Sequence, residues 1–361
     1  MENFNQNYQI IYNKEIGKGA FGKVYLAIDN NNKQYAAKQI NNEKEGIEVL
    51  ENEILINTEV QNENLVEFFG IKEIENKYFL FFEFCNGGDL DKNIKYYNEK
   101  YKKNINEQIL QKIMKDITNG LSCLHRNQII HHDLKSANIL VCYKTMEDKE
   151  NINLLNASFK ITDFGLSNYK NEILFHPEET SGNPKKLNRN ISGTPSYIPP
   201  SLIKILIEQL PKENSIIDND AVDMWSLGIL AYKLLFQRHP FLSKKEELSS
   251  DTNRKILTLY ERFKNGKYII DLKDGPVKSV SKEFIIFIDS LLKIKQEWRN
   301  SSEDCEYSRF ITRNYSKFHF LNNQNYIQEV SKELIGEEGL LLFDIKNEKK
   351  IKEYKGFEEI S

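Results

Sequence analysis

Two short runs in the middle of the chain combine the residue types that phosphate chemistry needs. One is a D-x-K-x-x-N run that begins at Asp133, and the other is a D-F-G run that begins at Asp163. Asp133 offers a general base and Lys135 offers a cation for a moving phosphoryl group. Asn138 and Asp163 offer the oxygen ligands that Mg²⁺ prefers. Together these groups are the parts that phosphoryl transfer requires.

A glycine-rich segment, GKGAFG from Gly17 to Gly22, lies near the start of the chain and is followed by the strand-like run KVYLAI. A G-x-G-x-x-G pattern alone is a weak signal. A dinucleotide-binding turn leads from a strand into a helix, so strands on both sides indicate a glycine hairpin instead. Because glycine lacks a Cβ atom, the backbone amides around Gly17, Gly19 and Gly22 can approach phosphate oxygens closely.

A lysine in the next predicted strand, Lys38, is a candidate phosphate contact if a carboxylate holds its ammonium in place. Glu53 on the following predicted helix is suitable, and spacing favours it over Glu51 because the next strand then begins at the right distance. The plainer alternatives are a solvated strand lysine and an exposed helical glutamate. The glycine hairpin upstream favours the phosphate contact.

The elements that must position these groups change character along the chain. The first 85 residues are predicted mostly as strands with one helix at 46–60, and long helices follow the Asn86-Gly87-Gly88 link. Polar segments at 143–156 and 169–192 are predicted surface insertions. The expected strands are 8–16, 23–28, 34–40, 66–74 and 78–85, the expected helices are 105–125, 223–236 and 282–293, and a further amphipathic helix is predicted around 326–334.

Composition excludes several classes of protein. The 361 residues are 40% hydrophobic and 29% charged, with a net charge of -3, so a wholly disordered or collagen-like chain is excluded. No long block of one charge predicts a nucleic-acid or membrane surface. The four cysteines are scattered without metal-ligand spacing and indicate a reducing compartment. No signal peptide or apolar run of spanning length is visible, so we expect a soluble cytoplasmic protein without a membrane span.

The ordered set of motifs, completed by Gly193-Thr194-Pro195-Ser196-Tyr197, resembles the eukaryotic protein kinases of the serine/threonine type. The resemblance covers residues 8–311. It implies an α+β, bilobal protein-kinase-like fold. A small antiparallel β-sheet N-lobe with one main helix would span about 8–85, and a larger, mainly helical C-lobe about 86–311. Residues 312–361 would form a C-terminal extension.

The resemblance also implies ATP and Mg²⁺ as cofactors. Gly17, Gly19 and Gly22 would cover the ATP phosphates, and Lys38 would contact the α- and β-phosphates while it pairs with Glu53. The groups expected around adenine and ribose are Ile16, Val24, Ala36 and Leu140 as the sandwich, Phe82 as the gatekeeper, Glu83 to Cys85 as the hinge, and Asp89 near the ribose.

For the transfer step, the resemblance implies that Asp133 accepts the proton of the substrate hydroxyl and that Lys135 neutralises the moving phosphoryl group. Asn138 and Asp163 would hold Mg²⁺. Thr194 would bond near this catalytic loop, and Asp223 would anchor the loop from a later helix.

The chain departs from the family pattern at several positions. His132 stands where many relatives carry the Arg that receives an activation-loop phosphate, and Asn57 replaces an apolar residue. Pro199-Pro200-Ser201 replaces Ala-Pro-Glu, so Arg299 lacks its usual carboxylate partner. Because a guanidinium stays charged, we expect Arg299 to meet a mixture of solvent and backbone carbonyls. Glu208 and Glu297 are the alternative partners.

Two functions fit these residues. The first is an ATP-dependent protein kinase that transfers the γ-phosphoryl group to serine or threonine hydroxyls of protein substrates, with Lys135 typical of that specificity. The alternative is a pseudokinase that acts as a nucleotide-binding scaffold or allosteric partner. Only His132, Asn57 and the altered tripeptide favour the alternative, since the lysine, the base and the Mg²⁺ ligands are all present. A regulatory partner for 312–361 is a further expectation.

Overall fold

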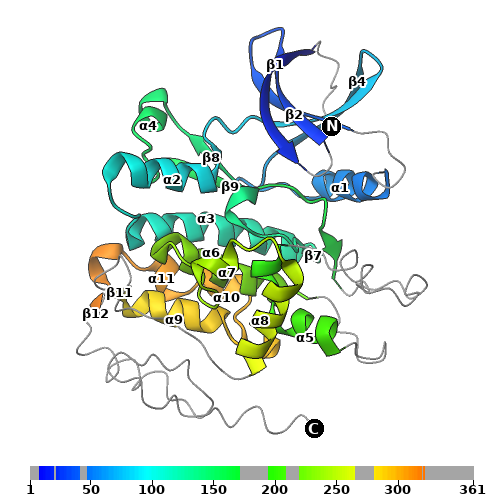
Figure 1. The fold of residues 1–361 in the computed structure, drawn as a ribbon. Helices are drawn as coiled ribbons and strands as arrows, with labels where there is room; N and C mark the ends of the chain where they lie inside the picture. The colour runs from blue at the N-terminus through cyan, green and yellow to red at the C-terminus, as the bar shows by residue number, and fades with distance from the viewer. Residues whose placement is uncertain are drawn as a thin grey trace.

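A computed structural model describes residues 8–19, 22–40, 47–170, 194–208, 219–264, 280–318 and 320–321. These residues form a small sheet-rich lobe and a larger helical lobe (Figure 1), as expected for an α+β bilobal fold. Residues 171–192 of the expected polar insertion and the helix expected around 326–334 lie outside the described residues. Within the described part, no helix is both long and apolar enough to cross a membrane.

The N-lobe is built on a five-stranded antiparallel sheet in the order β1-β2-β3-β5-β4. Alternation explains the central strand β3, in which Tyr35 and Ala37 are buried on one face of the sheet. Tyr35 packs edge-on against Phe81 of the neighbouring strand β5 and against Phe69 of β4 beyond it. The strands are β1 (Tyr8–Gly19), β2 (Gly22–Asp29), β3 (Gln34–Gln39), β4 (Phe68–Ile74) and β5 (Lys77–Glu83).

One helix, α1 (Ile47–Glu59), accompanies this sheet, where the apolar spacing predicted a helix at 46–60. It presents Glu53, Ile56 and Asn57 as buried residues. A carboxylate that is only 2% exposed requires a cationic partner. The sheet supplies that partner.

The C-lobe is organised around two helices, α3 and α6. The apolar stripe of α3 predicted from the sequence, including Ile113, Ile117 and Leu121, is completely buried. Its first turn begins two residues later than expected because the Asn106 side chain caps the helix by accepting from the Ile109 amide. The helices are α2 (Leu90–Tyr101), α3 (Glu107–Arg126), α4 (Met146–Glu150), α5 (Pro200–Glu208), α6 (Ala221–Phe236), α7 (Lys244–Glu247), α8 (Thr252–Lys264), α9 (Lys282–Leu291), α10 (Ser302–Glu306) and α11 (Arg309–Thr312).

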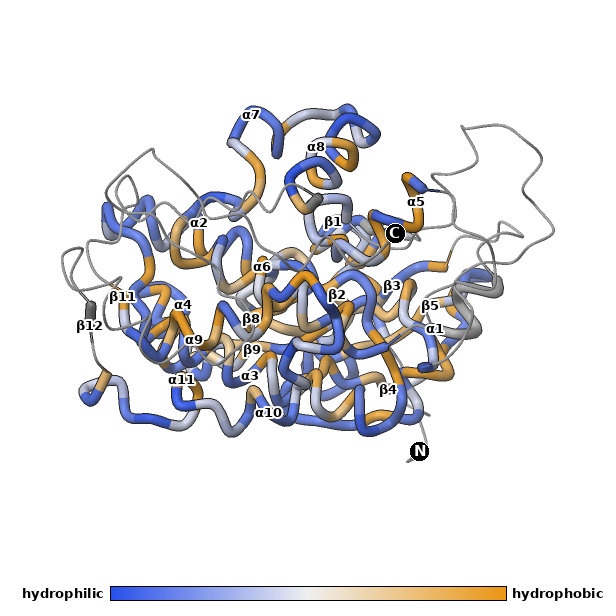
Figure 2. Tube along the Cα trace, turned by 90° about the horizontal axis from the view of Figure 1, so that it is seen from below, coloured by the Kyte–Doolittle hydropathy of each residue, from blue (hydrophilic) through white to orange (hydrophobic). Residues whose placement is uncertain are grey.

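Hydropathy follows this arrangement. In Figure 2 hydrophobic and hydrophilic residues alternate around the C-lobe helices, whereas α7 at the periphery is hydrophilic. By contrast α6 is buried along nearly its whole length, including Trp225 and Tyr232. A helix that is apolar on every side belongs in the centre of a lobe. Helix α6 therefore gives the loops packed against it a rigid base.

Short strands complete the C-lobe. Strands β8 (Ile139–Tyr143) and β9 (Ala157–Ile161) form an antiparallel hairpin whose connection carries α4. The polar segment 143–156 is therefore an insertion in this hairpin, which accounts for the long separation between Asp133 and Asp163. The remaining pairs join β6 (Gly88–Asp89) to β8, β7 (Ile129–Ile130) to β10 (Asn168–Tyr169), and β11 (Val280–Ser281) to β12 (Phe320–Leu321).

Candidate active site

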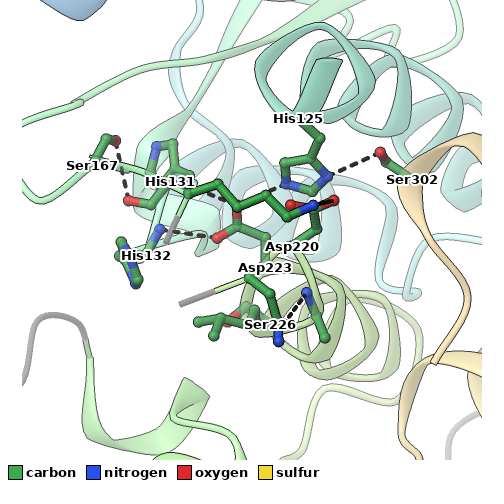
Figure 3. A network of polar contacts seen from close by, with 12 residues as sticks. His125, His131, His132, Ser167, Asp220, Asp223, Ser226 and Ser302 are labelled. Atoms are coloured by element: carbon green, nitrogen blue, oxygen red, sulfur yellow. Dashed lines mark hydrogen bonds and ion pairs between the residues drawn. The ribbon is translucent and has the colours of Figure 1, made fainter. Parts of the chain in front are cut away.

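The loop that follows β7 is held from below by one carboxylate. Asp223 on α6 accepts hydrogen bonds from the backbone amides of His131 and His132, at 2.7 Å and 2.9 Å. His125 Nε2 lies 3.0 Å from the same carboxylate and its Nδ1 lies 2.9 Å from Ser302 Oγ. Figure 3 shows these groups converging on Asp223. The carboxylate therefore fixes the backbone just before Asp133.

Electrostatics favour the ionised form of this anchor. Burial alone would raise the pKa of Asp223, but the hydrogen bond with His125 and the neighbouring imidazoles lower it to about 2. His132 has a left-handed backbone (φ 66°), which is uncommon for a non-glycine residue. The bond from its amide to Asp223 holds the chain in that conformation.

The same loop is bonded to the D-F-G segment. His131 Nε2 lies 3.1 Å from the Thr162 carbonyl oxygen, and the His131 ring meets Phe164 edge-on at 5.6 Å. The Ser167 hydroxyl donates to the His131 carbonyl at 3.2 Å (Figure 3). These contacts bring the two motifs, which are far apart in sequence, into one unit.

Three polar side chains surround the carboxylate of Asp133. Thr194 Oγ1 donates to Oδ1 at 2.8 Å, while Lys135 Nζ and Asn138 Nδ2 approach Oδ2 at 2.5 Å and 3.1 Å. Lys135 also donates to Thr194 Oγ1 at 3.0 Å. A carboxylate accepting this many bonds is oriented as a hydrogen-bond acceptor, and Thr194 lies beside the catalytic loop as expected.

Lys38 and Glu53 form a buried ion pair between the sheet and α1. Lys38 Nζ lies 2.6 Å and 2.8 Å from the two Glu53 oxygens, and the side chains are 12% and 3% exposed. Burial raises the pKa of Glu53 and nearby Asp163 adds to the effect, whereas Lys38 opposes both. The Glu53 carboxylate therefore needs its lysine.

The oxygens of Asn138 and Asp163 fit the donor set of Mg²⁺. The amide nitrogen of Asn138 donates hydrogen bonds to Asp133, and the amide oxygen Oδ1 has no hydrogen bond among the described residues. The Asp163 carboxylate, on a left-handed backbone (φ 70°), likewise has no hydrogen bond or ion pair within the described part. Carboxylate and amide oxygens without another partner are the donor types that Mg²⁺ prefers.

The glycine hairpin is closely packed at its end. Gly19 pairs with Gly22 in the β1–β2 register, and a Cβ atom on Gly22 would lie 2.1 Å from the Gln39 carbonyl oxygen. No side chain fits there, so glycine is required for close approach of the two backbones. Gly17 pairs with Val24 two positions further along the register.

Several residues expected around adenine are paired across neighbouring strands. Ala36 pairs with Phe82 across β3 and β5, and Asp89 pairs with Leu140 across β6 and β8. Asp89 also caps α2, accepting from the Lys92 amide at 2.9 Å. Val24 lies opposite Lys38 in the β2–β3 register. Ile16 is 40% exposed and is not a member of any of these pairs.

The departures from the family pattern have local solutions. Asn57 is buried and donates to the Glu53 carbonyl at 2.7 Å. The guanidinium of Arg299 is bonded to carbonyl oxygens of Lys293, Ala221 and Ile294 at 2.8 Å, 2.7 Å and 3.2 Å.

The expected carbonyl contacts of Arg299 are therefore present, but the expected solvent contact is wrong because the residue is only 8% exposed and lies over the Trp225 ring. The expectation failed because the segment after α9, with the Lys293 and Ile294 carbonyls, and the first residue of α6, Ala221, both bring carbonyl oxygens to this side chain. Of the alternative partners, Glu208 accepts instead from the Tyr260 hydroxyl at 2.7 Å.

Two features of the site have weak signals in the sequence. His125 was expected only as the last residue of the helix at 105–125, and nothing in its spacing indicates that Asp223 is its partner. Glu83, Cys85 and Cys142 come together in space although the cysteines are 57 positions apart. The proximity of the two thiols could have been predicted only from the position of the hinge relative to β8 in space.

Comparisons with known proteins agree with this geometry. The family described as "Protein kinase domain" matches residues 10–311. The chain is 28% identical over 308 residues to serine/threonine-protein kinase 33 of Mus musculus, covering 84% of this chain and 55% of that protein. It is 32% identical over 296 residues to a probable myosin light chain kinase of Dictyostelium discoideum (81% of this chain, 80% of that protein).

A third relative, Aurora kinase C of Mus musculus, is 28% identical over 255 residues, which cover 69% of this chain and 77% of that protein. The chain thus spans about half the length of the first of these relatives and most of the others. The family match extends over both lobes and includes every motif described above. The chain therefore belongs to the eukaryotic protein kinase family.

Proposed function

We propose that this chain is a catalytically active, ATP-dependent serine/threonine protein kinase. The observation that carries the proposal is the arrangement around Asp133. Its carboxylate, as the base, lies beside the ammonium of Lys135 and beside Asn138, whose amide oxygen is unengaged among the described residues. Lys38, held by Glu53, completes the set on the N-lobe side. A chain that had lost catalysis would have no need to keep all of these groups oriented.

In this proposal ATP supplies the γ-phosphoryl group and Mg²⁺ neutralises phosphate charge. Lys38 contacts the α- and β-phosphates, and Glu53 prevents its ammonium from turning away. The backbone of Gly17, Gly19 and Gly22 covers the phosphates. Catalysis then consists mainly of positioning and charge neutralisation.

Asp133 accepts the proton of the attacking hydroxyl. Its Oδ2 atom is oriented by Lys135 and Asn138, so the carboxylate presents a fixed lone pair. The Lys135 ammonium, beside Asp133, neutralises the negative charge of the transferred phosphoryl group. Asn138 and Asp163 hold Mg²⁺ through the oxygens that have no other partner within the described residues.

The nucleotide base is placed by the β3–β5 pair and by the β6–β8 pair. The backbone from Glu83 to Cys85 offers hydrogen-bonding groups to adenine, with Phe82 at the gatekeeper position. Ile16, Val24, Ala36 and Leu140 enclose the ring, and Asp89 lies near the ribose. The kinase domain is proposed to span 8–311, with 312–361 as an extension that a regulatory partner contacts.

The protein substrate supplies a serine or threonine hydroxyl, and the cysteine usage supports a cytoplasmic location. The pseudokinase alternative rests on His132, Asn57 and the Pro199-Pro200-Ser201 replacement. Two of these are accommodated locally, since Asn57 bonds to the Glu53 carbonyl and the Arg299 guanidinium is bonded to backbone carbonyls. The balance favours activity.

The proposal is tested with three peptides that differ only in the acceptor, which is serine, threonine or tyrosine. Transfer of labelled γ-phosphate is followed with Mg²⁺ and with an excess of EDTA. We expect Mg²⁺-dependent transfer to the serine and threonine peptides and little to the tyrosine peptide. Nucleotide binding without transfer to any of the three would support the pseudokinase alternative.

A further inference from the structure

A cluster of metal-binding side chains lies where the hinge meets the C-lobe hairpin. One carboxylate oxygen of Glu83, the sulfur of Cys85 and the sulfur of Cys142 all lie within 4.8 Å of one another. Both cysteines are free thiols, Cys85 buried and Cys142 half-buried. Glu83 ends β5, and Cys142 belongs to β8. The cluster therefore joins the two lobes.

We propose that Glu83, Cys85 and Cys142 form a binding site for one thiophilic divalent cation, with Zn²⁺ as the representative ion. Zinc bonds to sulfur at about 2.3 Å and to carboxylate oxygen at about 2.0–2.2 Å, so tetrahedral donors lie roughly 3.5–3.8 Å apart. The three donors are already close to that spacing. Three protein ligands would leave a fourth position for water.

The backbone fixes the two halves of the site relative to each other. The Gly87 amide donates to the Val141 carbonyl at 2.8 Å. The side chain of Asn86 forms hydrogen bonds with both the amide and the carbonyl of Tyr143, at 2.8 Å and 3.0 Å. These bonds are made by the two residues that directly follow Cys85 on one segment, and on the other segment they flank Cys142 on both sides. Little rearrangement is needed for the thiols to share a cation.

Charge is balanced with and without the cation. Lys160 Nζ lies 2.8 Å from Glu83 Oε2, and the only other hydrogen bond to this carboxylate among the described residues also ends on Oε2. Oε1 is left for a metal. With both thiols protonated, the cluster and Lys160 together have no net charge, and with two thiolates and a divalent cation they again have none.

Binding therefore exchanges two protons for one cation. The hydrogen bond with Cys142, together with burial, raises the pKa of the Cys85 thiol. Because each thiol must lose its proton to become a thiolate ligand, metal affinity should rise with pH. Ordinary hard-cation binding by carboxylates would not show this dependence.

A functional consequence follows, which rests on the proposed function. The backbone near Cys85 and the side chain of Leu140, two residues before Cys142, are the proposed contacts of adenine. A cation that links the hinge to β8 would restrict this region, and we expect Zn²⁺ to raise the KM for ATP. Metal binding itself is measured without ATP, so the two proposals can fail separately.

The experiment titrates the full-length, tag-free, reduced chain with Zn²⁺ by calorimetry in buffers of different ionisation enthalpy. Cd²⁺ is used in parallel for its thiolate charge-transfer absorption. The expected result is one cation per chain, release of about two protons and a thiolate band. Cys142→Ser should weaken binding at least 10-fold and abolish most of the band.

The matched control is Cys123→Ser, which removes another half-exposed thiol outside the cluster and should leave binding unchanged. Glu83→Gln should also weaken binding about 10-fold while the thiolate band persists. Thermal melting confirms that each variant is folded, and Cys142→Ala provides a second test if Cys142→Ser is not. Unchanged affinity in folded Cys142→Ser or Cys142→Ala, no binding at micromolar Zn²⁺, or dependence on Cys123 would each overturn the proposal.

Discussion

Lys38 and Glu53 form the polar connection between the sheet and α1, with both Glu53 oxygens within 2.8 Å of the lysine ammonium. The carboxylate is nearly inaccessible to solvent. Removing one member of such a pair leaves an uncompensated buried charge, which typically costs about 3–5 kcal/mol. The pair is therefore structural as well as a proposed part of catalysis.

These two roles can be separated. We expect Lys38→Met to lower phosphoryl transfer by orders of magnitude and also to lower the melting temperature, because Glu53 loses its partner. In the double variant Lys38→Met with Glu53→Gln the charge is gone, so stability should recover while activity does not. Denaturant unfolding and transfer assays on the same preparations check this. Recovery of activity in the double variant would exclude Lys38 from catalysis.

Arg299 should resist conservative replacement. Its planar guanidinium reaches three carbonyl oxygens and covers Trp225, a geometry that a lysine ammonium cannot reproduce. We expect Arg299→Lys to reduce the free energy of unfolding by about 1–3 kcal/mol. Arg309→Lys, at an exposed position, is the control and should have little effect. Equal stability of the two variants would contradict this account of Arg299.

Glu107 should make stability depend on pH. Burial raises its pKa from 4.5 to about 7, an effect to which Glu283 adds and which hydrogen bonds from Ser281 reduce. The folded protein then retains a proton that the unfolded chain releases between about pH 4.5 and 7. This contribution to stability is complete below pH 4.5 and is lost as the pH rises through 7.

Glu107→Gln removes that dependence. The variant should match the wild type near pH 4.5 and exceed its stability at pH 8 by on the order of 3 kcal/mol. Unfolding by urea at the two pH values measures the difference. A constant difference between the proteins across this range would show that Glu107 does not titrate as described.

Activity should depend little on phosphorylation of the segment before Thr194. His132 stands where relatives carry an arginine, and a neutral imidazole has no permanent charge that demands an anion. We expect phosphatase-treated protein to retain most of its transfer activity, with mass spectrometry confirming phosphate removal.

The candidate acceptors Thr180, Ser181 and Ser192, which lie outside the described residues, should be individually replaceable by alanine. A large loss of activity after dephosphorylation would contradict the prediction. It would point to a basic residue other than position 132, such as Lys185, Lys186 or Arg189, as the phosphate contact.

Much of the fold could be predicted because its signals are local. The stripe on α3 and the alternation in β3 each follow from the side chains of one segment. Element ends were less predictable because they depend on capping residues such as Asn106. Which of several neighbouring residues caps the helix is decided by the backbone geometry.

Contacts between segments that are distant in the sequence could be predicted only in part. The Lys38–Glu53 pair could be expected because spacing and the family resemblance both indicate Glu53 as the partner, whereas the carbonyl contacts of Arg299 depend on how the segment after α9 packs against α6. The Glu83–Cys85–Cys142 cluster was missed for the same reason, since the scattered cysteines carry no ligand spacing. Sequence spacing reports neighbours along one element and not the register between two elements.

The most direct test of catalysis compares the wild type with Asp133→Asn. Asparagine preserves the shape of the side chain and removes the acceptor of the substrate proton. We predict that ATP affinity, measured by nucleotide-dependent thermal stabilisation, changes little while labelled phosphate transfer to a basic protein substrate falls by orders of magnitude. Transfer near the wild-type rate by the folded Asp133→Asn protein, or no Mg²⁺-dependent transfer by the wild type, would contradict the account.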